Sequence, residues 1–499
     1  MKLEQLIRVL PNKKIIDGRH QLSHVFIDHL TSSSSEVSAN TLFIAIRGFS
    51  TDGHTFLESV VKAGVRCVVV EKAQDLSSEV VQVVVSDTRV AMAQLACAFY
   101  QHPSQNMTCV GITGTNGKTT TTFLLESILR EASFFPGVIG TIHYRYQGHC
   151  ILAPNTTPDA LTFQSLLSRM HQAGVTHLVC EVSSHGLKLH RVDGTQFDVV
   201  IFTNLTQDHL DFHPDFEDYY QSKKRLFVPM LFESSKKQKS AVINIDDAYG
   251  RRLRDEIKND CNVLTYSVSD PSASIYGMEV SFSQNGIRAK LKVGAQVIPM
   301  ASCLLGQHNF SNILAAWAAS YALHIPSELI LKGIAALRSV PGRLQRVDVG
   351  QDFLVVVDYA HTDDALLNVG RALTAMKENR IITVFGCGGD RDRKKRPLMA
   401  KATQSFSDYV IVTSDNPRTE DPTQIIEDIK VGFSNPSIPI VIEPDRKKAI
   451  VHAVMQAKSG DIILIAGKGH EDYQIVGKQK IHFDDAEVAE GACLKRLKS

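Results

Sequence analysis

Short apolar runs alternate with amphipathic, helix-like segments along almost the whole chain. The runs are TLFIAIRG, CVVVEKA and VVQVVVSD in the first hundred residues, CVGIT, HLVCEV, FDVVIF and SAVIN in the middle, and FLVVVD, IITVFG, YVIVT, IPIVI and DIILIAG in the last third. Strands of a parallel sheet appear as continuous apolar runs, because helices cover both faces of the sheet. The pattern therefore predicts an α/β protein built on parallel sheets.

The runs fall into three regions, which we predict to be domains spanning 1–106, 107–338 and 339–499. The first region ends in the polar stretch HPSQNMT, and the third begins near RSVPGRLQRV. A chain of 499 residues is too long for one ordinary domain and typically forms about three.

Nearly every apolar run in the second and third regions ends in residues capable of chemistry. These strand ends are GTNGKTT, EVSSHGL, TNLTQDHLDFH, DYAHT, GCGGDRD, SDNPR and AGKGHED. Ligands of parallel sheets bind at the carboxyl ends of the strands. Polar loops also follow strands that have no role in binding. The seven strand ends together therefore support a binding site more strongly than any one of them does.

The stretch GITGTNGKTT, residues 111–120, resembles a phosphate-binding loop between a strand and a helix. Its glycines allow backbone N–H groups to face phosphate oxygens, Lys118 would reach the outer phosphates, and the hydroxyl of Thr119 would help to hold Mg²⁺. The strict pattern is not met, because Ile112 stands where a glycine is usual. We predict nucleotide-phosphate binding here.

Two further strand ends supply Glu181 and His209, a carboxylate and an imidazole. They suit Mg²⁺ only if phosphate and water provide the other ligands, since Mg²⁺ prefers oxygen. Lys223 and Lys224 follow on a predicted helix, where two adjacent lysines ordinarily form a solvated basic face.

The third region combines glycines with charges of both signs. GCGGDRDRKKRP includes Arg391, SDNPR includes Asp415 and Arg418, and GKGHED includes Gly467, Lys468, His470 and Glu471. A run of arginines and lysines is usually solvated surface, but guanidinium also binds carboxylate or phosphate at two points. A zwitterion such as an amino acid would need both signs of charge in one place.

Composition narrows the class of protein. Hydrophobic content of 43%, charged content of 21% and a net charge of +1 are typical of a globular protein and give no sign of nucleic-acid or membrane-surface binding. Nine cysteines without a CxxC pair indicate reduced thiols. The start, MKLEQLIRVLPNKK, lacks the features of a signal peptide. We expect a cytoplasmic protein without membrane insertion or obligate oligomerisation, and therefore a monomer.

The motifs GTNGKTT, NTTPD, EVSSHGL, TNLTQDHLDFH, GQHNFSN, PGRLQRV, VDYAHT and GKGHEDYQ resemble, in this order, those of the Mur ligases. These ATP-dependent amide ligases build the peptide of bacterial cell-wall precursors. The resemblance implies a small N-terminal α/β domain that binds the UDP end of the precursor, a central P-loop-type ATPase domain and a C-terminal Rossmann-like domain that receives an amino acid. It also implies that ATP, with two Mg²⁺, converts a carboxylate to an acyl phosphate, which the amine then attacks.

The resemblance also implies roles for single residues. Lys118, Glu181, His209 and a carbamylated Lys223 would act in catalysis, and Thr119, Glu181, His209 and the modified Lys223 would hold metal. Residues assigned to ATP are Gly114, Thr115, Asn116, Gly117, Lys118, Thr119, Thr120, Asn309, Asn312 and Arg343, while Asp358 and His361 would close the site. Residues assigned to the UDP-muramoyl-dipeptide are Ser34, Asn155, Thr156, Thr157, Ser183 and Arg191.

Asp415-Asn416-Pro417-Arg418 resembles the stretch found in Mur ligases that add meso-diaminopimelate rather than lysine. Diaminopimelate is lysine with a second carboxylate at its far end, and a guanidinium can bind that carboxylate at two points. Residues assigned to this substrate are Arg391, Asp415, Asn416, Arg418, Gly467 and Glu471.

Three alternatives stay open. A lysine-adding ligase of the same family would share most motifs. A folylpolyglutamate synthase would share the ATPase and C-terminal domains but lack a separate UDP-binding domain. A nucleotide switch that ligates nothing would not account for the charged, glycine-rich third region. The sequence also departs from the family: Ser33-Ser34-Ser35 replaces Asp-Ser-Arg, Asn40 replaces Gly, Leu189 stands where relatives can have a polar contact, and Asp363 stands where Pro is usual.

Overall fold

The computed structural model describes residues 1–18, 22–209, 212–433 and 438–498. It divides into two compact units, one comprising 1–266 with 315–326 and the other 267–314 with 327–499. The boundaries of the three domains expected from the sequence stay a prediction. The apolar runs form strands as predicted, because their β-branched side chains are buried on both faces of the sheets.

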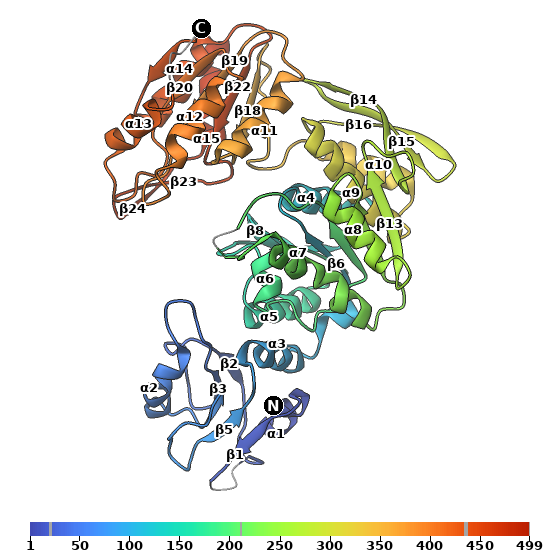
Figure 1. Ribbon diagram of the computed structural model, residues 1–499, viewed down its shortest axis with the longest axis vertical. Coiled ribbons are helices and arrows are strands. Elements are labelled where there is room, and N and C mark those ends of the chain that lie inside the picture. The colour runs from blue at the N-terminus through green and yellow to red at the C-terminus, as the bar shows by residue number, and fades with distance from the viewer. Residues whose placement is uncertain (19–21, 210–211, 434–437, 499) are drawn as a thin grey trace. The chain divides into compact units, whose positions relative to one another are not determined.

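The first unit begins with a five-stranded sheet in the order β1-β5-β4-β3-β2 (Figure 1). Its elements are α1 (Leu3–Leu6), β1 (Lys14–Ile16), β2 (His29–Thr31), β3 (Thr41–Ile44), α2 (Leu57–Lys62), β4 (Cys67–Val70), β5 (Val81–Val84) and α3 (Thr88–Phe99). Side chains of α1 and α3 pack on one face of this sheet, and those of α2 pack on the other. Strand β1 pairs antiparallel to β5, whereas the other strands are parallel.

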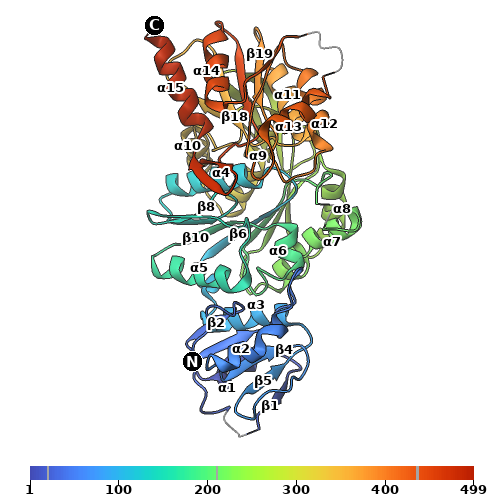
Figure 2. The ribbon, with the colours of Figure 1, turned by 90° about the vertical axis from the view of Figure 1, so that its left-hand side faces the viewer.

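The remainder of the first unit is a second sheet, with strands in the order β13-β12-β11-β6-β10-β7-β8-β9. Its strands are β6 (Thr108–Thr113), β7 (Pro136–Ile139), β8 (His143–Tyr146), β9 (His149–Leu152), β10 (His177–Glu181), β11 (Val199–Phe202), β12 (Ser240–Asn244) and β13 (Asn262–Ser267). Its helices are α4 (Lys118–Glu131), α5 (Ala160–Gln172), α6 (Ser184–Lys188), α7 (Phe216–Lys224) and α8 (Ala248–Ile257). Helices α4 and α5 lie on opposite faces of the sheet (Figure 2).

The central strands of this sheet are parallel, so their carboxyl ends meet at one edge. The register sets Glu181 of β10 beside Ile112 of β6, and Phe202 of β11 beside Thr113. Three sequence-distant loops therefore begin side by side. The prediction of parallel strands is confirmed for this core, whereas β8 and β9 are antiparallel, because short turns rather than helices connect them to their neighbours.

The second unit contains three antiparallel strands and a mostly parallel six-stranded α/β sheet. The antiparallel strands are β14 (Ile275–Ser283), β15 (Gly286–Val293) and β16 (Gln296–Ser302), followed by α9 (Gln307–Ala322), of which residues 307–314 belong to this unit, and by α10 (Ser327–Ala336). The six-stranded sheet has the order β17-β18-β22-β19-β20-β21, with β17 antiparallel to β18 and the other pairs parallel. Its strands are β17 (Gln345–Val347), β18 (Leu354–Asp358), β19 (Ile381–Phe385), β20 (Tyr409–Val412), β21 (Ile440–Ile442) and β22 (Ile462–Ala466).

Helices cover both faces of the six-stranded sheet. They are α11 (Asp363–Thr374), α12 (Lys395–Gln404), α13 (Pro422–Lys430), α14 (Arg446–Gln456) and α15 (Asp485–Leu497). Side chains of α11, α12 and α13 form one core layer, and those of α14 and α15 form the other. A hairpin of β23 (Tyr473–Val476) and β24 (Gln479–His482) precedes α15. No helix among the described residues is long and apolar enough to cross a membrane.

Candidate active site

The phosphate-like loop joins the end of β6 to the start of α4. Gly117 precedes the helix with a φ of 89°, and no side chain caps the first turn. The N–H groups of that turn can therefore face an anion. Gly114 has a φ of 148°, and a Cβ there would lie 1.8 Å from Oγ1 of Thr203, so only glycine fits. Lys118 Nζ donates to the carbonyl oxygens of Gly114 and Thr115, each at 2.8 Å.

The loop following β11 anchors the phosphate-like loop. The backbone N–H of Thr115 donates to the carbonyl oxygen of Asn204, and that of Asn116 donates to Oδ1 of the same residue, both at 2.9 Å. These two amides are therefore already bonded, and the N–H groups at the start of α4 are better placed to meet a phosphate. Thr119 and Thr120 lie in that first turn and are buried.

Glu181 ends β10 beside the phosphate-like loop and is 1% exposed. Its Oε2 accepts hydrogen bonds from Oγ1 of Thr119 at 3.1 Å and from Oγ1 of Thr141 at 2.8 Å. Its Oε1 accepts from the backbone N–H of Thr141 at 3.0 Å. Carboxylate and hydroxyl oxygens thus lie together at the start of α4, which is a donor set that fits Mg²⁺.

Lys223 lies on α7 with only 1% of its surface exposed. Its Nζ lies 4.4 Å from the centre of the Tyr219 ring, and the Tyr219 hydroxyl is 3.0 Å from Oγ1 of Thr115. Burial, and then the neighbouring charge of Lys118, lower the pKa of Lys223 well below its usual value. Lys224 instead pairs with Glu256 at 2.8 Å. The two adjacent lysines therefore occupy different environments.

His209 lies close to the same tyrosine. The His209 and Tyr219 ring centres are 6.1 Å apart, and His185 meets His209 edge-on at 4.9 Å. Leu210 and Asp211, from the same predicted motif, lie outside the described residues. Among the described residues, no three His, Cys, Asp or Glu side chains gather as a ready-made metal site. A metal here would thus also need oxygens from hydroxyl groups, phosphate or a modified lysine.

Most residues assigned to the muramoyl-dipeptide surround the end of β10. Thr157 Oγ1 donates to the carbonyl oxygen of Glu181 at 2.9 Å and accepts from the N–H of Ser183 at 3.0 Å. Arg191 Nη1 donates to the carbonyl oxygen of Thr157 at 2.8 Å. Burial lowers the pKa of Arg191.

The other three residues of this set lie in different surroundings. Thr156 Oγ1 is 3.1 Å from Oγ1 of Thr141. The Asn155 side chain is exposed, and its carbonyl oxygen accepts from the hydroxyl of Tyr144. Ser34 follows β2 in the N-terminal sheet, where it is partly buried.

The remaining ATP candidates belong to the second unit. Asn309 and Asn312 are buried on α9 and are joined by a hydrogen bond from Nδ2 of Asn312 to Oδ1 of Asn309 at 3.1 Å. Arg343 lies over the ring of Tyr359 at 5.3 Å, and its buried Nε has no hydrogen-bond partner among the described residues. An incoming anion would accept the hydrogen bond that this buried N–H group does not make within the described residues.

The two residues expected to close the site follow β18. Asp358 accepts hydrogen bonds from the N–H groups of Leu344 and Ala360, at 2.7 and 2.8 Å. Nδ1 of His361 lies 2.8 Å from the carbonyl oxygen of Tyr359. Asp358 therefore shapes the turn in this structure, while the His361 side chain is exposed.

The stretch from Asp415 to Arg418 follows β20, and its side chains meet the segment following β22. Nδ2 of Asn416 donates to Oε2 of Glu471 at 2.8 Å, and Asp415 is buried. Burial raises the pKa of the Asp415 carboxyl, although Arg446 and Lys468 act in the opposite direction. Gly467 has a φ of 114°, and a Cβ there would lie 2.8 Å from Oδ2 of Asp415.

Arg418 has the left-handed φ of 53°. Its Nη1 donates to the carbonyl oxygen of Gly389 at 2.8 Å. Within the described part of the chain, no carboxylate forms an ion pair with Arg418, in contrast to Arg393 and Arg396, which both pair with Glu420. The Arg391 side chain is exposed on the adjacent loop.

Sequence reasoning missed two residues that contact the predicted ones. Thr141 donates two hydrogen bonds to Glu181, and Tyr219 lies between Lys223 and Thr115. Lys468, which the sequence analysis named without assigning it a role, is fully buried. Lys468 Nζ donates to Oδ1 of Asn416 at 3.4 Å, to Oε2 of Glu471 at 3.3 Å and to the carbonyl oxygen of Tyr473. Thr141 ends an apolar run, GVIGT, and this position was the available signal.

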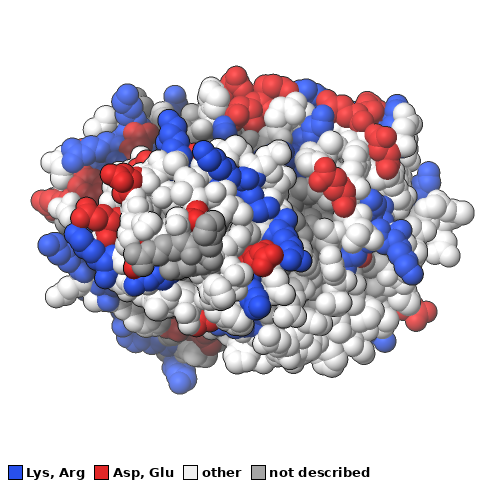
Figure 3. All heavy atoms as spheres, turned by 90° about the horizontal axis from the view of Figure 1, so that it is seen from below, with Lys and Arg blue, Asp and Glu red and all other residues white. Residues whose placement is uncertain are grey.

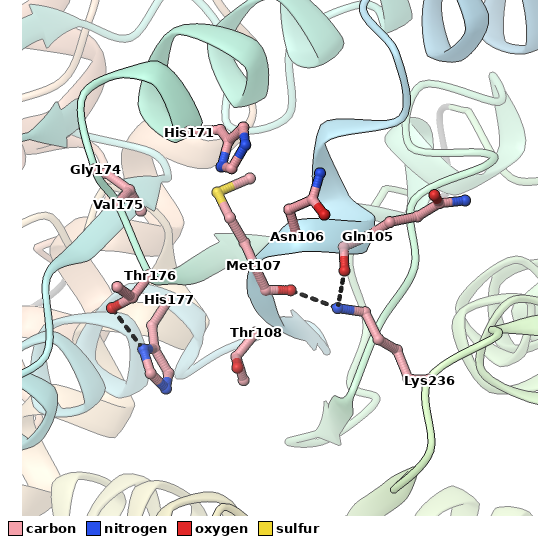
Figure 4. Close-up of a pocket in the computed structure, with 10 residues that line it drawn as sticks. All are labelled: Gln105, Asn106, Met107, Thr108, His171, Gly174, Val175, Thr176, His177 and Lys236. Carbon is pink, nitrogen blue, oxygen red and sulfur yellow. Dashed lines mark hydrogen bonds between the residues drawn. The ribbon is translucent and has the colours of Figure 1, made fainter.

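A separate cavity of about 500 Å³ lies elsewhere in the first unit (Figure 4). It is lined by residues at the starts of β6 and β10, including Thr108 and His177, and therefore lies at the opposite edge of the sheet from the phosphate-like loop. Lys236 Nζ donates to the carbonyl oxygens of Gln105 and Met107 across this cavity. On the surface seen in Figure 3, basic and acidic side chains are interspersed.

Three family profiles match successive parts of the chain. They are described as Mur ligase family, catalytic domain, for residues 26–100, Mur ligase middle domain for 112–320, and Mur ligase, glutamate ligase domain, for 342–469. The chain is 44% identical to a UDP-N-acetylmuramoyl-L-alanyl-D-glutamate–2,6-diaminopimelate ligase of Geobacter metallireducens, over 99% of this chain and 98% of that protein. A protein of the same name from Lactiplantibacillus plantarum is 42% identical, with 98% of each chain covered.

Solved structures agree with these matches. A UDP-N-acetylmuramoyl-L-alanyl-D-glutamate–2,6-diaminopimelate ligase superimposes with a TM-score of 0.74 and 32% identity, over 99% of both chains. A Mycobacterium tuberculosis folylpolyglutamate synthase complexed with ADP and AMPPCP superimposes with a TM-score of 0.61 and 17% identity, over 82% of this chain and 95% of that one. At 17% identity, the similarity to the folylpolyglutamate synthase shows a shared fold and nothing more.

Proposed function

The chain belongs to the Mur ligase family, and we propose that it joins meso-2,6-diaminopimelate to the D-glutamate carboxylate of UDP-N-acetylmuramoyl-L-alanyl-D-glutamate, using ATP. This reaction builds the peptide of the peptidoglycan precursor. The observation that carries the choice of amino acid is Arg418, a guanidinium that pairs with no carboxylate among the described residues and donates only to the carbonyl oxygen of Gly389. It stands in the same short stretch as the buried acid Asp415 and as Asn416, which binds the half-buried acid Glu471. Such a site matches a ligand with both signs of charge at its far end.

The first step transfers the γ-phosphoryl group of ATP to the carboxylate, which gives an acyl phosphate and ADP. Phosphoryl transfer depends mainly on positioning and on neutralising negative charge. The first turn of α4 would bind phosphate oxygens, and Lys118 would leave its two loop carbonyls to reach the outer phosphates. Arg343, whose buried Nε has no hydrogen-bond partner among the described residues, is a further candidate for binding phosphate.

The oxygens at the start of α4 fit Mg²⁺, with Thr119 and Glu181 as ligands and a second ion beside His209 and a carbamylated Lys223. Bound there, Mg²⁺ would neutralise charge on the phosphates. Lys223 suits carbamylation because its burial favours the neutral amine, and only a neutral amine can add CO₂. Lys224, paired with Glu256, lacks this environment.

In the second step the free amine of diaminopimelate attacks the acyl phosphate, and the tetrahedral intermediate expels phosphate. Arg418 and Arg391 would bind the distal carboxylate and anchor the ligand, while the second carboxylate oxygen of Glu471 would meet the distal ammonium. Oε2 of Glu471 is already held by Asn416 and Lys468, so Asn416 positions this acid. The muramoyl-dipeptide would lie along Thr156, Thr157, Ser183 and Arg191, with Asn155 at its edge and Ser34 towards the uridine.

We also propose three domains with boundaries near 106 and 338, a monomeric enzyme, and a cytoplasmic location, where ATP and a UDP-linked precursor are both available. The folylpolyglutamate synthase alternative lacks a counterpart for the match at 26–100. The lysine-adding alternative differs only in the amino acid, so experiment must separate it.

The decisive experiment is a competition between meso-diaminopimelate and L-lysine, with ATP and the UDP-muramoyl-dipeptide present. We expect ADP release only when the UDP-linked peptide and an amino acid are both supplied, with diaminopimelate strongly preferred. ATP turnover that ignores the UDP-linked peptide would refute the ligase proposal, and a preference for lysine would refute the choice of amino acid.

Arg418→Ala tests the assignment of the distal carboxylate. Losing one charge-assisted contact should weaken the use of diaminopimelate by about 1.5–3 kcal/mol, or roughly 10- to 150-fold in kcat/KM. Arg393→Ala is the matched control, since Arg393 lies on the same side of the sheet but already pairs with Glu420 at 2.9 Å. Equal kinetics in the two variants would contradict the assignment.

A further inference from the structure

The hairpin of β23 and β24 is bonded to the loop that carries the amino-acid specificity. The backbone N–H of Arg418 donates to the carbonyl oxygen of Ile475 at 3.1 Å, and the N–H of Gly477 donates to the carbonyl oxygen of Arg418 at 2.8 Å. The main chain of Arg418 is therefore held on both sides by the hairpin, as an isolated bridge opposite Val476.

The same hairpin also holds the two residues that begin the loop. Nε2 of Gln474 donates to the carbonyl oxygen of Asp415 at 2.6 Å. The N–H of Ile475 donates to Oδ1 of Asn416 at 2.9 Å, and the other end of the Asn416 amide holds Glu471. The two charged residues of the stretch 415–418, Asp415 and Arg418, are thus bonded through their main chains to β23 or to the turn that follows it.

These contacts matter because neither the β23–β24 hairpin nor the conformation of Arg418 is stable by itself. Strand β24 is exposed throughout and β23 is at most half-buried, and a two-stranded hairpin without a core is marginal in water. Arg418 has a left-handed φ of 53°, a conformation that a residue with a Cβ adopts only at a cost. The hairpin supplies the main-chain bonds that keep Arg418 in that conformation, and the loop supplies contacts that keep the hairpin formed.

We propose that the β23–β24 hairpin is a specificity-determining element, which positions Arg418 and Glu471 so that only an amino acid with a distal carboxylate is well bound. The inference rests on the proposed function and deepens it, since it assigns part of the substrate choice to residues that do not touch the substrate. It has two consequences. Loosening the hairpin impairs the use of diaminopimelate far more than the use of lysine, because lysine has no distal carboxylate for Arg418 to bind. Bound diaminopimelate in turn stabilises the hairpin.

Two pairs of variants test the proposal in the full-length enzyme. Gly477→Ala places a Cβ at a φ of +61°, where no heavy atom lies within 4 Å, so its effect is confined to the backbone of the turn. Gly294→Ala is the matched control, with a φ of +59° and equally open space in the turn between β15 and β16. Gln474→Ala removes the bond to Asp415, and Gln479→Ala removes the same type of side chain from the exposed facing strand.

We expect Gly477→Ala to lower the ratio of kcat/KM for diaminopimelate over lysine by roughly fivefold or more, and Gln474→Ala by roughly three- to tenfold. The loss should lie in KM for diaminopimelate, with KM for ATP and for the UDP-linked peptide unchanged. Gly294→Ala and Gln479→Ala should keep the wild-type ratio. Hydrogen exchange should show the amides of residues 473–482 becoming more protected when diaminopimelate is added, and less so in Gly477→Ala.

The outcomes separate this inference from the function on which it rests. If the wild-type enzyme does not use diaminopimelate, the proposed function fails. If the wild-type enzyme prefers diaminopimelate but both hairpin variants keep its ratio, the inference is overturned. A uniform loss of kcat with all KM values unchanged, or an equal effect of Gly294→Ala, would likewise overturn it, because a general loss of folded enzyme would explain such results.

Discussion

The ion pair of Arg446 and Asp485 offers a prediction whose magnitude follows from the structure. Both side chains are fully buried, and the guanidinium donates to the carboxylate from Nε at 2.7 Å and from Nη2 at 2.6 Å. Arg446 also donates to the carbonyl oxygens of Ala466 and Ser414, at 3.0 and 3.4 Å. The first carbonyl ends β22 and the second follows β20, so the pair connects the two segments that carry the proposed amino-acid site.

Asp485→Ala should destabilise the second unit by about 3–5 kcal/mol, because it leaves a buried cation with only two carbonyl partners. Burial alone would lower the pKa of Arg446, yet the charge of Asp485 raises it, so the cation depends on this carboxylate. Replacing both residues, as Arg446→Met with Asp485→Leu, should recover part of the loss, since no charge then stays buried.

The assay is native-state hydrogen exchange at the amides of β22, because a chain of several domains has no single free energy of unfolding. The control is Glu217→Ala, which breaks an exposed pair with Arg252 of similar geometry and should change exchange little. If Asp485→Ala shifted exchange no more than Glu217→Ala, the buried pair would not hold the strand ends together, and the reasoning would be wrong.

The remaining predictions concern the first unit. Gly114→Ala should weaken binding of an ATP analogue roughly tenfold or more, because its Cβ would overlap Thr203, whereas Gly148→Ala, with a φ of 80° and open space, should bind normally. With isotope-labelled bicarbonate, Lys223 should give a carbamate signal that disappears in Lys223→Arg and persists in Lys224→Arg; the reverse would contradict the role of burial. Burial lowers the pKa of His177 to about 4. Above about pH 6.5 the imidazole is neutral in the folded and the unfolded chain, whereas between pH 6.5 and 4 only the unfolded chain takes up the proton, so the folded state loses stability as the pH falls. At pH 5 this loss should reach about 2 kcal/mol, and His177→Gln should flatten the acid side of the pH profile of native-state hydrogen exchange at the amides of β10.

The candidate site could be proposed from sequence because residues capable of chemistry stand at the ends of predicted strands. Apolar runs predicted the parallel strands, and the candidates that follow them, such as Lys118, Glu181 and Arg418, were chosen from position and residue type. Thr141 escaped because it acts through Glu181, a partner that is distant in the chain. A threonine after an apolar run does not reveal which carboxylate it binds.

The sequence by itself determined the α/β class, the order of the strands along the chain and the candidates for binding phosphate or a zwitterion, because these depend on local periodicity and local chemistry. The tertiary structure decided which of two adjacent lysines is buried, that β23 holds Arg418 in a left-handed conformation, and that Asn416 holds Glu471. The last two facts depend on packing between segments about 60 residues apart, as with Arg418 and Ile475. Local sequence patterns do not identify such pairings, because many residues satisfy the same pattern and only the packing of the folded chain selects among them.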